Sequence, residues 1–459
     1  MRQVAGKHLI SAYAISLEAW RRGLRVTVRH PQWAVYDISD GNSTVTFNYS
    51  RPTSLTSPEA HRIVEDKWRT VEALRSSGVP SPASRMFPAK DSSLIGVLEE
   101  ATRIGYPVVL KPTRGSVGRG VFPNLQDAQE VQNAMQKLLH VTKSRRLLVE
   151  EHFSGDDYRI YVVGGHAVAA TRRIPAHVVG DGQSTISDLI SAKNRNRRAN
   201  PGLSTSTIKR SADIASHLAS QGLSYEYIPL EGETVYLRYK ANASAGGDVV
   251  DALDALPGNV KEAAVEAVRA IPGLSAAGVD ILYNPNLSDD EDYFRVIELN
   301  SRAHFGGIMY PTVGTGRDVP KAVIDAYFPE SQRHPWADSL KQVGINAKDI
   351  ISSLLTGTVG EVTISPLENH GYRARREWKI PLPEGGLTWL QIQELKKLAL
   401  ASKVFGFADR RGSSLRVVAA GRGSRVKSFK SHLATLLDTQ IPKGSHYGKP
   451  IYTGFDIYQ

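Results

Sequence analysis

The glycine-rich segment Thr113–Gly120, which follows an apolar strand ending at Lys111, constrains the fold of this chain most. Its glycines, Gly115, Gly118 and Gly120, let backbone N–H groups approach phosphate oxygens, while nearby basic side chains neutralise phosphate charge. The segment lacks the Gly-Lys-Ser/Thr ending of a Walker loop, and it does not open a helix as the dinucleotide-binding fingerprint does. Taken alone, it indicates either a phosphate-binding loop or an ordinary glycine-rich hairpin.

The length and composition describe a folded protein with several domains. The chain has 459 residues, of which 41% are apolar and 22% charged, and these values exclude a wholly disordered or low-complexity chain. At roughly 150 residues per domain, the length predicts about two to four domains. The absence of cysteine excludes disulfides, thiolate metal ligands and a cysteine nucleophile.

The net charge of +11 comes from separated basic clusters and not from one tail. Three such clusters are Lys143–Arg146, Arg195–Arg198 and Arg373–Arg376. Their spread favours a small anionic ligand or a solvated surface, and the chain shows neither zinc-finger spacing nor the aromatic signature of an RNA-binding sheet. We therefore expect no nucleic-acid partner.

No apolar stretch is long enough to cross a membrane. The segment Leu9–Leu17 comes closest, but Ser11 and Ser16 interrupt it and Glu18 follows it. We interpret it as a buried helix, with a signal peptide as the alternative. We therefore expect a cytoplasmic protein without a membrane partner, and the sequence leaves a homo-oligomer open.

The order of predicted elements indicates an α+β architecture. Strands such as Val108–Lys111 alternate with helices such as Leu125–Leu139. Ser57 precedes a proline and apolar residues at helical spacing, which predicts one helix that stops at Gly78. The polar and basic segment Asn194–Arg210 predicts a mobile loop.

The chain divides into three predicted parts. Residues 1–60 form an N-terminal segment in which Asp40-Gly41-Asn42 is a hairpin turn. Residues 61–335 form the main domain, and a break near Pro329–Pro335 precedes a last unit over 340–459.

Acidic residues follow the strand that comes after the glycine loop. Glu150 and Glu151 end this strand, and Asp157 comes a few residues later. A carboxylate at a strand end can hold an adenine edge, and a later one can bind ribose hydroxyls. An acidic surface turn explains the same pattern.

Two later strands carry a second set of polar side chains. Asp280 lies in one strand, and Glu298 and Asn300 lie two apart on another, so that both point to the same face. Buried acids are costly unless they are paired or bound to metal, and an all-oxygen set suits Mg²⁺ better than Zn²⁺.

In this order, the motifs resemble the ATP-grasp superfamily of carboxylate–amine ligases. The closer resemblance, over about residues 5–330, is to the central module of cyanophycin synthetase and to the glutathione-synthetase part of the bifunctional bacterial glutathione enzyme. It implies an N-terminal pre-ATP-grasp segment and two α+β lobes that enclose ATP. The matching motifs are Asp66-Lys67, Lys111 with its glycine loop, Val178–Thr185, Leu237–Gly247, Gly278–Asp280 and Glu298–Asn300.

The resemblance implies roles for the residues at matching positions. ATP would contact Lys67, Lys111, Gly115, Ser116, Gly118, Gly120, Glu150, Glu151, Phe153 and Asp157. Two Mg²⁺ ions, replaceable by Mn²⁺, would bind to Asp280, Glu298 and Asn300. The substrates would contact Arg159, Arg172, Arg173, Ser244, Gly246, Gly247 and His304. Catalytic contacts would come from Arg238, Asn242 and Arg302.

The resemblance also implies an ADP-forming ligase for an amine and an amino acid or peptide-like carboxylate. The carboxylate attacks the γ-phosphorus of ATP, and the amine then displaces phosphate from the acylphosphate. No covalent enzyme nucleophile is needed, in agreement with the lack of cysteine. Two alternatives stay open: a ligase for a carrier protein or peptide end that docks on Asn194–Arg210, and a nucleotide-binding regulator without catalysis.

The chain departs from D-alanine–D-alanine ligase near the predicted metal residues. Gly278 stands where that enzyme has an arginine, and the Ser-Pro-Gly stretch after the metal asparagine is missing. The acceptor pocket therefore does not carry over from that enzyme. Arg302 and His304 also have explanations other than substrate contact. Arg302 could belong to a structural hydrogen-bond network, and His304 could lie behind the residues that contact the substrate.

The last unit resembles the second half of an acylphosphatase over Val404–Gly421, followed by a helix over Arg425–Leu437. Arg410 stands at the position of the catalytic asparagine, and Ile380–Gly386 replaces the phosphate loop. We therefore predict a degenerate, ferredoxin-like accessory domain without hydrolase activity.

Overall fold

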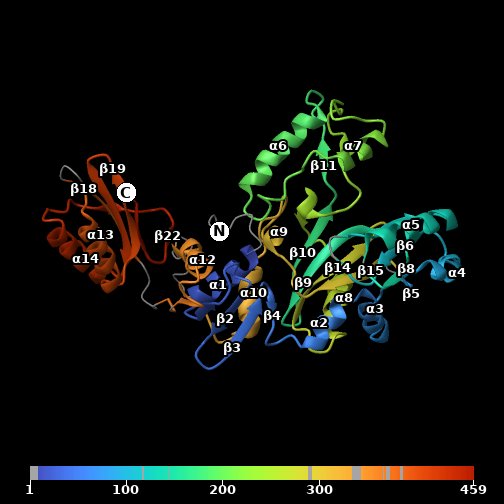
Figure 1. Ribbon diagram of the computed structural model, residues 1–459, viewed down its shortest axis with the longest axis horizontal. Helices are drawn as coiled ribbons and strands as arrows, with labels where there is room; N and C mark the ends of the chain where they lie inside the picture. The colour runs from blue at the N-terminus through green and yellow to red at the C-terminus, as the bar shows by residue number, and fades with distance from the viewer. Residues whose placement is uncertain are drawn as a thin grey trace. The chain divides into compact units, whose positions relative to one another are not determined.

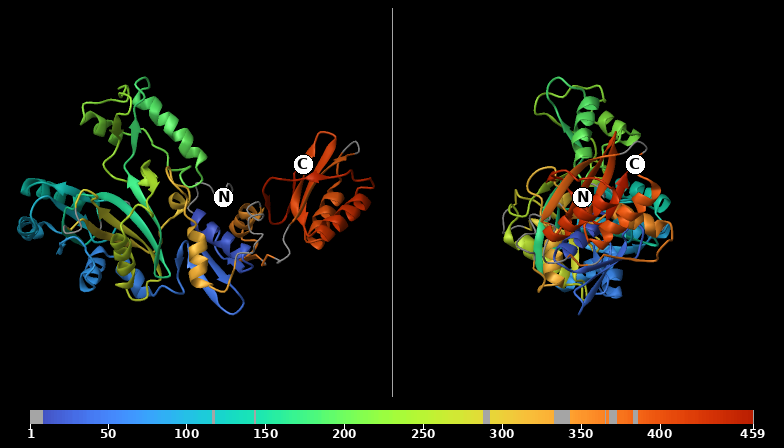
Figure 2. Two further views of the ribbon diagram at one scale, coloured as in Figure 1. Left: turned by 180° about the vertical axis from the view of Figure 1, so that it is seen from behind. Right: turned by 90° about the vertical axis from the view of Figure 1, so that its left-hand side faces the viewer.

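The computed structural model describes residues 9–115, 118–142, 144–287, 292–332, 343–364, 366–367, 373–382 and 386–458 (Figures 1 and 2). The chain forms two compact units: the first comprises Met1–Ala12 and Val45–Tyr327, and the second Tyr13–Thr44 and Phe328–Gln459. Both contain helices and sheets, which confirms the predicted α+β class. The limits of the three predicted parts stay predictions.

A four-stranded sheet in the first unit carries the glycine loop. Its strands lie in the order β5 (Ser84–Pro88), β8 (Arg146–Glu151), β6 (Val108–Pro112) and β7 (Phe122–Leu125). Helices α4 (Leu94–Ile104) and α5 (Ala128–Val141) share its apolar core. Asp127 caps α5, so that this helix begins after the predicted Leu125, which instead ends β7.

A five-stranded antiparallel sheet forms the second layer of this unit. Its strands lie in the order β13 (Asp248–Asp251), β10 (His166–Ile174), β9 (Asp156–Val163), β14 (Ala276–Tyr283) and β15 (Phe294–Asn300). Helix α8 (Gly258–Arg269) packs on the face that presents Ile160, Val279 and Leu299. Because side chains alternate along a strand, the neighbouring charged residues point to the other face.

Two helices, and not one, follow Ser57. Ser57 caps α2 (Pro58–Val64) as predicted, but α3 (Lys67–Ser76) is a separate helix. The carboxylate of Asp66 accepts hydrogen bonds from N–H groups in the first turn of α3. The predicted continuous helix is wrong because Asp66 starts a new N-terminus within the apolar pattern.

Asp66 also joins α3 to the four-stranded sheet. Its fully buried carboxylate lies 2.9 Å from Nη2 of Arg146 on β8 and 3.4 Å from Nε of Arg114 beside the glycine loop. The next residue, Lys67, donates its backbone N–H to the carbonyl oxygen of Thr113 at 2.9 Å. The position of α3 is therefore fixed against the loop that we expect to bind phosphate.

A smaller subdomain projects from the five-stranded sheet (Figure 1). It contains β11 (His177–Val179), α6 (Ile186–Ala199), α7 (Ala212–Ala219), β12 (Thr234–Tyr236) and the short helix η3 (Ala243–Ala245).

The predicted mobile loop over Asn194–Arg210 is wrong at its start, because α6 continues to Ala199. The buried Asn194 amide then bonds both backbone groups of Ile208, at 2.9 and 2.8 Å.

Arg197 is a structural cation in this subdomain. Its buried guanidinium donates to the carbonyl oxygens of Ser206 at 2.7 Å, Gly247 at 3.0 Å and Ala243 at 3.0 Å. It also lies 3.1 Å from a carboxylate oxygen of Asp248. Arg197 therefore connects α6 to the segment in which we predicted substrate contacts.

Further short elements complete the first unit. The strands are β3 (Thr44–Asn48), whose first residue belongs to the second unit, and β4 (Arg51–Pro52). The helices are α9 (Gly306–Met309) and α10 (Val319–Tyr327).

The second unit contains most of α1 (Ile10–Arg21), which confirms the predicted helix. Gly23 follows it with a φ of +83°, as a helix C-terminus favours. Strand β1 (Arg25–Val28) pairs in antiparallel fashion with β2 (Val35–Ser39) and β17 (Val362–Ile364).

The C-terminal part of the second unit has the element order β18-α13-β19-β20-α14-β21, and its strands lie in the order β21-β18-β20-β19-β23. This agrees with the predicted βαββαβ order, while the relation to acylphosphatases stays a prediction. Of the predicted replacement loop, residues 383–385 lie outside the described residues. The bounds are β18 (Ala374–Pro381), α13 (Trp389–Ala401), β19 (Phe405–Arg411), β20 (Ser414–Gly421), α14 (Gly423–Leu436), β21 (Ser445–His446) and β23 (Phe455–Tyr458).

Three short elements precede or interrupt this part: β16 (Val343–Gly344), α12 (Ala347–Leu355) and β22 (Ile451–Tyr452). Strands β16 and β22 pair in parallel. Among the helices in the described ranges, none is long and apolar enough to cross a membrane.

Asp66→Ala should destabilise the protein by about 2–4 kcal/mol, because it removes a helix cap and leaves two arginines without their carboxylate. Asp66→Asn keeps the cap and should cost only about 1 kcal/mol. Urea unfolding followed by far-UV circular dichroism measures both changes. Equal stability of Asp66→Ala and wild type would contradict this role.

Arg197→Met should destabilise the projecting subdomain by about 3–5 kcal/mol, because it leaves buried carbonyl groups without their donor and removes one of the cations paired with Asp248, which keeps Lys193 at 2.6 Å. Hydrogen exchange should become faster over residues 243–248. Arg195→Met and Arg198→Met are matched controls with exposed side chains, and each should change stability by no more than about 0.5 kcal/mol. Similar behaviour of all three variants would rule out a special role for Arg197.

Candidate active site

Lys111 and Glu150 form a buried ion pair on the four-stranded sheet. Nζ of Lys111 lies 2.5 Å from Oε2 of Glu150, and Oε1 of Glu150 accepts a hydrogen bond from the Ser84 hydroxyl at 3.2 Å. An ammonium group has three N–H donors, so that Lys111 can bind a phosphate oxygen without leaving Glu150. The structure thus brings together two residues that we predicted to contact ATP.

The glycine loop is held by lysines from two other parts of the first unit. Nζ of Lys67 on α3 donates to the carbonyl oxygen of Gly115 at 3.1 Å, and Nζ of Lys240 donates to that of Gly118 at 2.8 Å. Ser116, which we also predicted to contact ATP, lies outside the described residues.

The backbone of this loop requires glycine. Gly118 and Gly120 have φ values of +68° and +72°, which side chains other than glycine rarely adopt. At Gly118, a Cβ atom would also lie 3.4 Å from the Lys240 side chain. Substitution here would disturb both the backbone and the lysine contact.

Glu151 and Phe153 share one neighbour, Arg295 of β15. Nη2 of Arg295 lies 3.4 Å from Oε1 of Glu151, and its guanidinium lies over the Phe153 ring at 5.2 Å. Oε2 of Glu151 also accepts the backbone N–H of Ala83 at 3.2 Å. The structure therefore places both residues beside the four-stranded sheet, while their contact with adenine stays a prediction.

Charged residues gather on the face of the five-stranded sheet that points away from α8. Arg159 on β9 forms two hydrogen bonds of 2.7 Å with the carboxylate of Asp280 on β14. Arg173 on β10 lies 3.1 Å from Asp280 and also bonds Asp157. We call Asp157, Arg159, Arg173 and Asp280 the buried charge cluster.

The pKa values within this cluster follow from burial and charge. Burial raises the pKa of Asp280, but the guanidiniums of Arg159 and Arg173 outweigh burial and hold that pKa below its usual value. For Asp157, burial is the larger effect, and it raises the pKa although Arg173 opposes it. Asp280 is therefore ionised near neutral pH and is available as an anionic ligand.

A β-bulge turns Glu298 toward the same face. Asp280 lies opposite Glu298, but the next residue, Ile281, lies opposite Val296, so that Ile297 is the extra residue. Val296 can then point into the core while Glu298 points to the charged side. The predicted common face of Glu298 and Asn300 is confirmed, because their side chains contact each other.

Lys67 and Asn300 contact Glu298 from two sides. Nζ of Lys67 lies 3.6 Å from Oε2 of Glu298. With its amide oriented to satisfy its neighbours, Asn300 donates to Oε1 of Glu298 at 3.3 Å and accepts from Nη2 of Arg159 at 3.3 Å. Lys67 thus bridges the glycine loop and these oxygen donors.

The donor chemistry of this face fits a hard divalent cation. Asp280 and Glu298 lie directly opposite each other, and the repulsion between them is offset by the arginines beside Asp280 and by Lys67 beside Glu298. Their carboxylates and the Asn300 carbonyl are oxygen ligands of the kind that Mg²⁺ prefers. In the described ranges, no group of three His, Cys, Asp or Glu side chains has metal-site geometry.

Arg172, a predicted substrate contact, points to the other side of the sheet from its neighbour Arg173. Arg172 lies 3.0 Å from Asp156, and these two residues belong to the opposite side of the strands. Arg172 is therefore not part of the buried charge cluster, and its predicted substrate contact has no support from this arrangement.

The predicted acceptor segment 242–247 is closely packed. The Asn242 side chain caps η3 by accepting the N–H of Ser244 at 3.0 Å. At Gly246, a Cβ atom would lie 2.5 Å from Ile208, and at Gly247 it would lie 2.7 Å from the carbonyl oxygen of Ile174. Both glycines are therefore required by packing, whatever they contact in a complex.

Arg238 and Arg302 lie in different surroundings. Arg238 donates to the Ser211 hydroxyl at 3.2 Å, and its Nε is buried without a hydrogen-bond partner in the described part of the chain. Arg302 and His304 are exposed and line a pocket of about 280 Å³ in the first unit. The structure thus places Arg302 and His304 together, directly after the proposed metal residues.

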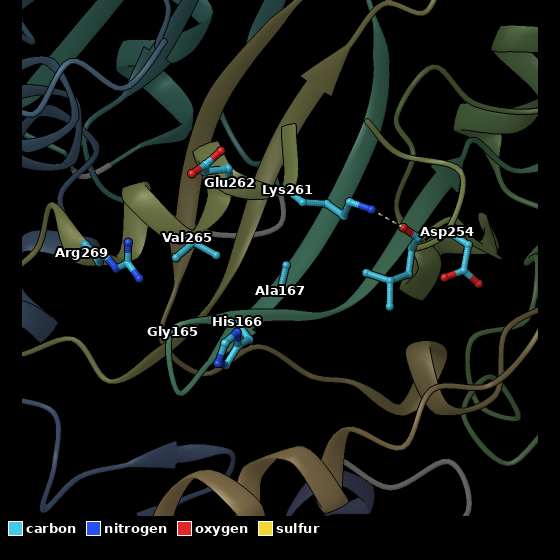
Figure 3. Close-up of a pocket in the computed structure, with 9 residues that line it drawn as sticks. Gly165, His166, Ala167, Asp254, Lys261, Glu262, Val265 and Arg269 are labelled. Atoms are coloured by element: carbon cyan, nitrogen blue, oxygen red, sulfur yellow. Dashed lines mark hydrogen bonds between the residues drawn. The ribbon is translucent and has the colours of Figure 1, made fainter. Parts of the chain in front are cut away.

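A larger pocket of about 600 Å³ lies between α8 and the β9–β10 turn (Figure 3). Its cations already have partners: Lys261 donates to the carbonyl oxygen of Leu253 at 3.3 Å, and Arg269 lies 2.6 Å from Glu266. It contains no residue that the sequence predicted to be functional. We therefore place the candidate site on the charged face of the sheet.

Lys240 is a site residue that the sequence analysis missed. It lies within the recognised motif Leu237–Gly247, but a single lysine beside aromatic and polar residues gave no reason to prefer it. Burial lowers its pKa, and its contact with Gly118 is visible only in the folded chain. If each lysine within the recognised motifs had been treated as a candidate contact of the glycine loop, Lys240 would have been among them.

The comparisons with known proteins agree with this geometry. Residues 64–305, more than half of the chain, match the family described as the ATP-grasp domain. Cyanophycin synthetase of Geminocystis herdmanii is 33% identical over 313 residues, which cover 67% of this chain and 34% of that protein. The bifunctional glutathione biosynthesis protein of Clostridium perfringens is 29% identical over 327 residues, covering 70% and 41%.

A solved structure shows the same fold. The crystal structure of a bifunctional glutathione synthetase from Pasteurella multocida has a TM-score of 0.51 and 27% identity, over 65% of this chain and 41% of that one. The chain spans about a third of the length of the cyanophycin synthetases that it matches. The family match and the shared fold show that this chain belongs to the ATP-grasp family.

Proposed function

We propose that this protein is an ATP-dependent, ADP-forming ligase that joins a carboxylate to an amine through an acylphosphate. The observation that carries the proposal is the position of Lys67, whose Nζ lies 3.1 Å from the carbonyl of Gly115 and 3.6 Å from Glu298. A cation between a glycine loop and paired carboxylates is suited to the terminal phosphates of a nucleotide. A binding-only protein has no need of this arrangement of acids.

The lysines would neutralise charge that develops during phosphoryl transfer. The substrate carboxylate oxygen attacks the γ-phosphorus and ADP leaves, which gives an acylphosphate. Lys67 and Lys111 would hold phosphate oxygens, and Lys240 would keep the glycine loop closed over them. Fixed cations in a site with little water stabilise such charge more than water does.

Asp280, Glu298 and Asn300 would bind the metal ions. ATP-grasp ligases use ATP with a divalent ion such as Mg²⁺. We propose two Mg²⁺ ions here, with Mn²⁺ as a substitute, because both prefer oxygen ligands. When bound, such ions neutralise phosphate charge. Arg159 and Arg173 would keep Asp280 ionised and oriented for this purpose.

The substrates would be small molecules, with a carboxylate of an amino acid or peptide and an amine as the two partners. In the second step, the amine nitrogen attacks the acyl carbon, phosphate leaves, and the nitrogen loses a proton to give the amide. Glu150, Glu151, Phe153 and Asp157 would bind the adenosine part of ATP. We also propose a cytoplasmic location, where ATP is available.

Docking of a carrier protein on the basic segment is the weaker alternative. Arg197, one of the cations of this segment, donates its N–H groups to carbonyl oxygens inside the protein. The segment therefore exposes less positive charge than its sequence indicates. A regulator without catalysis would have no use for the paired Asp280 and Glu298. We therefore prefer a small-molecule ligase.

Lys67→Met and Glu298→Gln should each lower ATP turnover by roughly 10²–10³-fold, because each removes fixed charge from the phosphate site. Phosphate release with Mg²⁺ is measured over amino acids and dipeptides, singly and in pairs, and mass spectrometry identifies products. Lys321→Met removes an exposed lysine paired with Asp325 and serves as the matched control. Unchanged turnover in Lys67→Met and Glu298→Gln would contradict the proposed site.

We propose that the C-terminal part is an accessory domain without hydrolase activity. Nε of Arg410 donates to the carbonyl of Gly412 within its own hairpin, at 3.3 Å, and offers no neutral amide to a substrate. The full chain should therefore hydrolyse benzoyl phosphate no faster than buffer does. Hydrolysis that disappears in Arg410→Ala would overturn this expectation.

A further inference from the structure

The two faces of the C-terminal sheet, which contains β18, β19 and β20, have different neighbours. On one face, Val417 of β20 shares an apolar core with helices α13 and α14. On the other face, Phe407 of β19 packs against the cluster that contains Ile451 of β22. Because side chains alternate along a strand, Asp409 points to the same face as Phe407, and Arg410 points to the opposite one. The face of Phe407 is therefore separate from the position where we predicted the remnant of a phosphatase site.

A pocket of about 360 Å³ opens on the face of Phe407, within the second unit. Three aromatic residues line it, Phe407, Tyr452 and Tyr458, together with the apolar Ile451. The rings of Phe407 and Tyr458 meet edge to face, with their centroids 6.3 Å apart. Pockets for drug-sized ligands measure roughly 300–1,000 Å³, so that this one suits a small molecule.

Arg416 is the cation among the residues that line this pocket, and its charge is already balanced. Its Nε lies 2.7 Å from Oδ1 of Asp409, and its Nη1 lies 3.7 Å from Oε1 of Glu377. The guanidinium also lies over the Phe407 ring, at 5.0 Å from the centroid. Arg416 therefore has little capacity left for an anionic ligand.

Asp456 on β23 lines the same pocket and lacks a cationic partner. Its Oδ2 accepts hydrogen bonds from the Tyr458 hydroxyl at 3.1 Å and from Nδ2 of Asn346 at 3.3 Å. In the described part of the chain, no lysine, arginine or histidine nitrogen lies within 4.0 Å of its carboxylate. Burial and the charge of Asp456 both raise the pKa of the neighbouring Asp349. The charge that this pocket leaves without a partner is therefore negative.

The surroundings of Asp456 favour an organic cation over a metal ion. Mg²⁺ and Ca²⁺ require several oxygen ligands, whereas this pocket offers one unpaired carboxylate among aromatic rings. Aromatic faces attract ammonium and guanidinium groups, and a carboxylate accepts their N–H groups in strong hydrogen bonds. An aliphatic chain on such a cation could pack against Ile451.

We propose that this pocket binds a small organic cation, which carries a primary ammonium or guanidinium group on an aliphatic chain. The cation would donate to Asp456, while Tyr452 and Tyr458 contact its charge and its chain. Because Arg416 is paired, the ligand needs no carboxylate. The inference assigns a binding site to the accessory domain, and it does not depend on the ligase function proposed for the first unit.

Isothermal titration calorimetry of the full chain tests this site. The probes are n-butylamine, cadaverine and agmatine, with butanol as a neutral control and butyrate as an anionic one. At least one cation should bind at least tenfold tighter than both controls. Hydrogen exchange measured with this cation should slow over β19 and β23, which carry Phe407 and Asp456.

Substitutions separate the contributions of charge and ring. Asp456→Asn keeps the size of the side chain and an oxygen acceptor, and should weaken binding at least tenfold. Tyr458 is 53% exposed, so that its substitution leaves the core intact. Tyr458→Leu should weaken binding about threefold, whereas Tyr458→Phe, which keeps the ring, should change it less than twofold. Glu394→Gln on α13 removes an acid paired with Lys397 and should leave binding unchanged.

Four results would overturn the proposal. They are no binding of any cation, equal binding of the cations and their controls, unchanged affinity in Asp456→Asn, and exchange protection confined to the first unit. The last result would place the cation outside the accessory domain. Circular dichroism checks that Asp456→Asn is folded. If it is not, the comparison of Tyr458→Leu with Tyr458→Phe supplies the test, and equal affinities of these two variants would then overturn the proposal.

Discussion

Asp280 is buried on the charged face of the central sheet, and its ionised carboxylate depends on two arginines from neighbouring strands. Arg159 reaches it with two hydrogen bonds of 2.7 Å, and Arg173 lies 3.1 Å away. Each of these residues belongs to a different strand, so that the cluster exists only in one register. A slip of one residue in any strand would place a charge in the apolar core under α8. The charged groups of the site are therefore brought together only when the strands of this sheet pair correctly.

Lys67 connects the charged face of the five-stranded sheet to the glycine loop of the four-stranded sheet. Its backbone bonds Thr113, and its side chain reaches Gly115 and Glu298. Asp66, the preceding residue, fixes the same helix through a cap and through Arg146. One short stretch thus sets the distance between the glycine loop and the acids, which is the distance that a nucleotide with its metal ions has to span.

The sequence was informative where function depends on local pattern. The glycine loop, Asp280, and the pair Glu298 and Asn300 follow from strand alternation and residue type, and the structure brings them to one region. Asp66 was missed as a helix start because apolar spacing continues on both sides of it. Arg197 was missed because a basic run looks the same whether its members are exposed or bonded to carbonyls.

Long-range features could not be predicted from such patterns. The bulge at Ile297 depends on pairing with β14, and the separation of Arg172 from the charge cluster depends on which face α8 covers. Arg51 lies in a two-residue strand without a motif, and only the folded chain shows that its guanidinium is buried. These are properties of contacts between distant segments, so that neither composition nor spacing contains them.

The glycine at position 278 leaves room for one such contact between distant segments. A Cβ atom there would lie 2.7 Å from Cβ of Ala303 and 3.4 Å from Cδ of Arg159, so that a side chain would displace both. The space is used by Arg159, which comes from β9 and pairs with Asp280 across the sheet. The neighbouring strand therefore supplies the cation that lies beside Asp280. Strand pairing, and not distance along the sequence, decides which side chains meet at this point of the sheet.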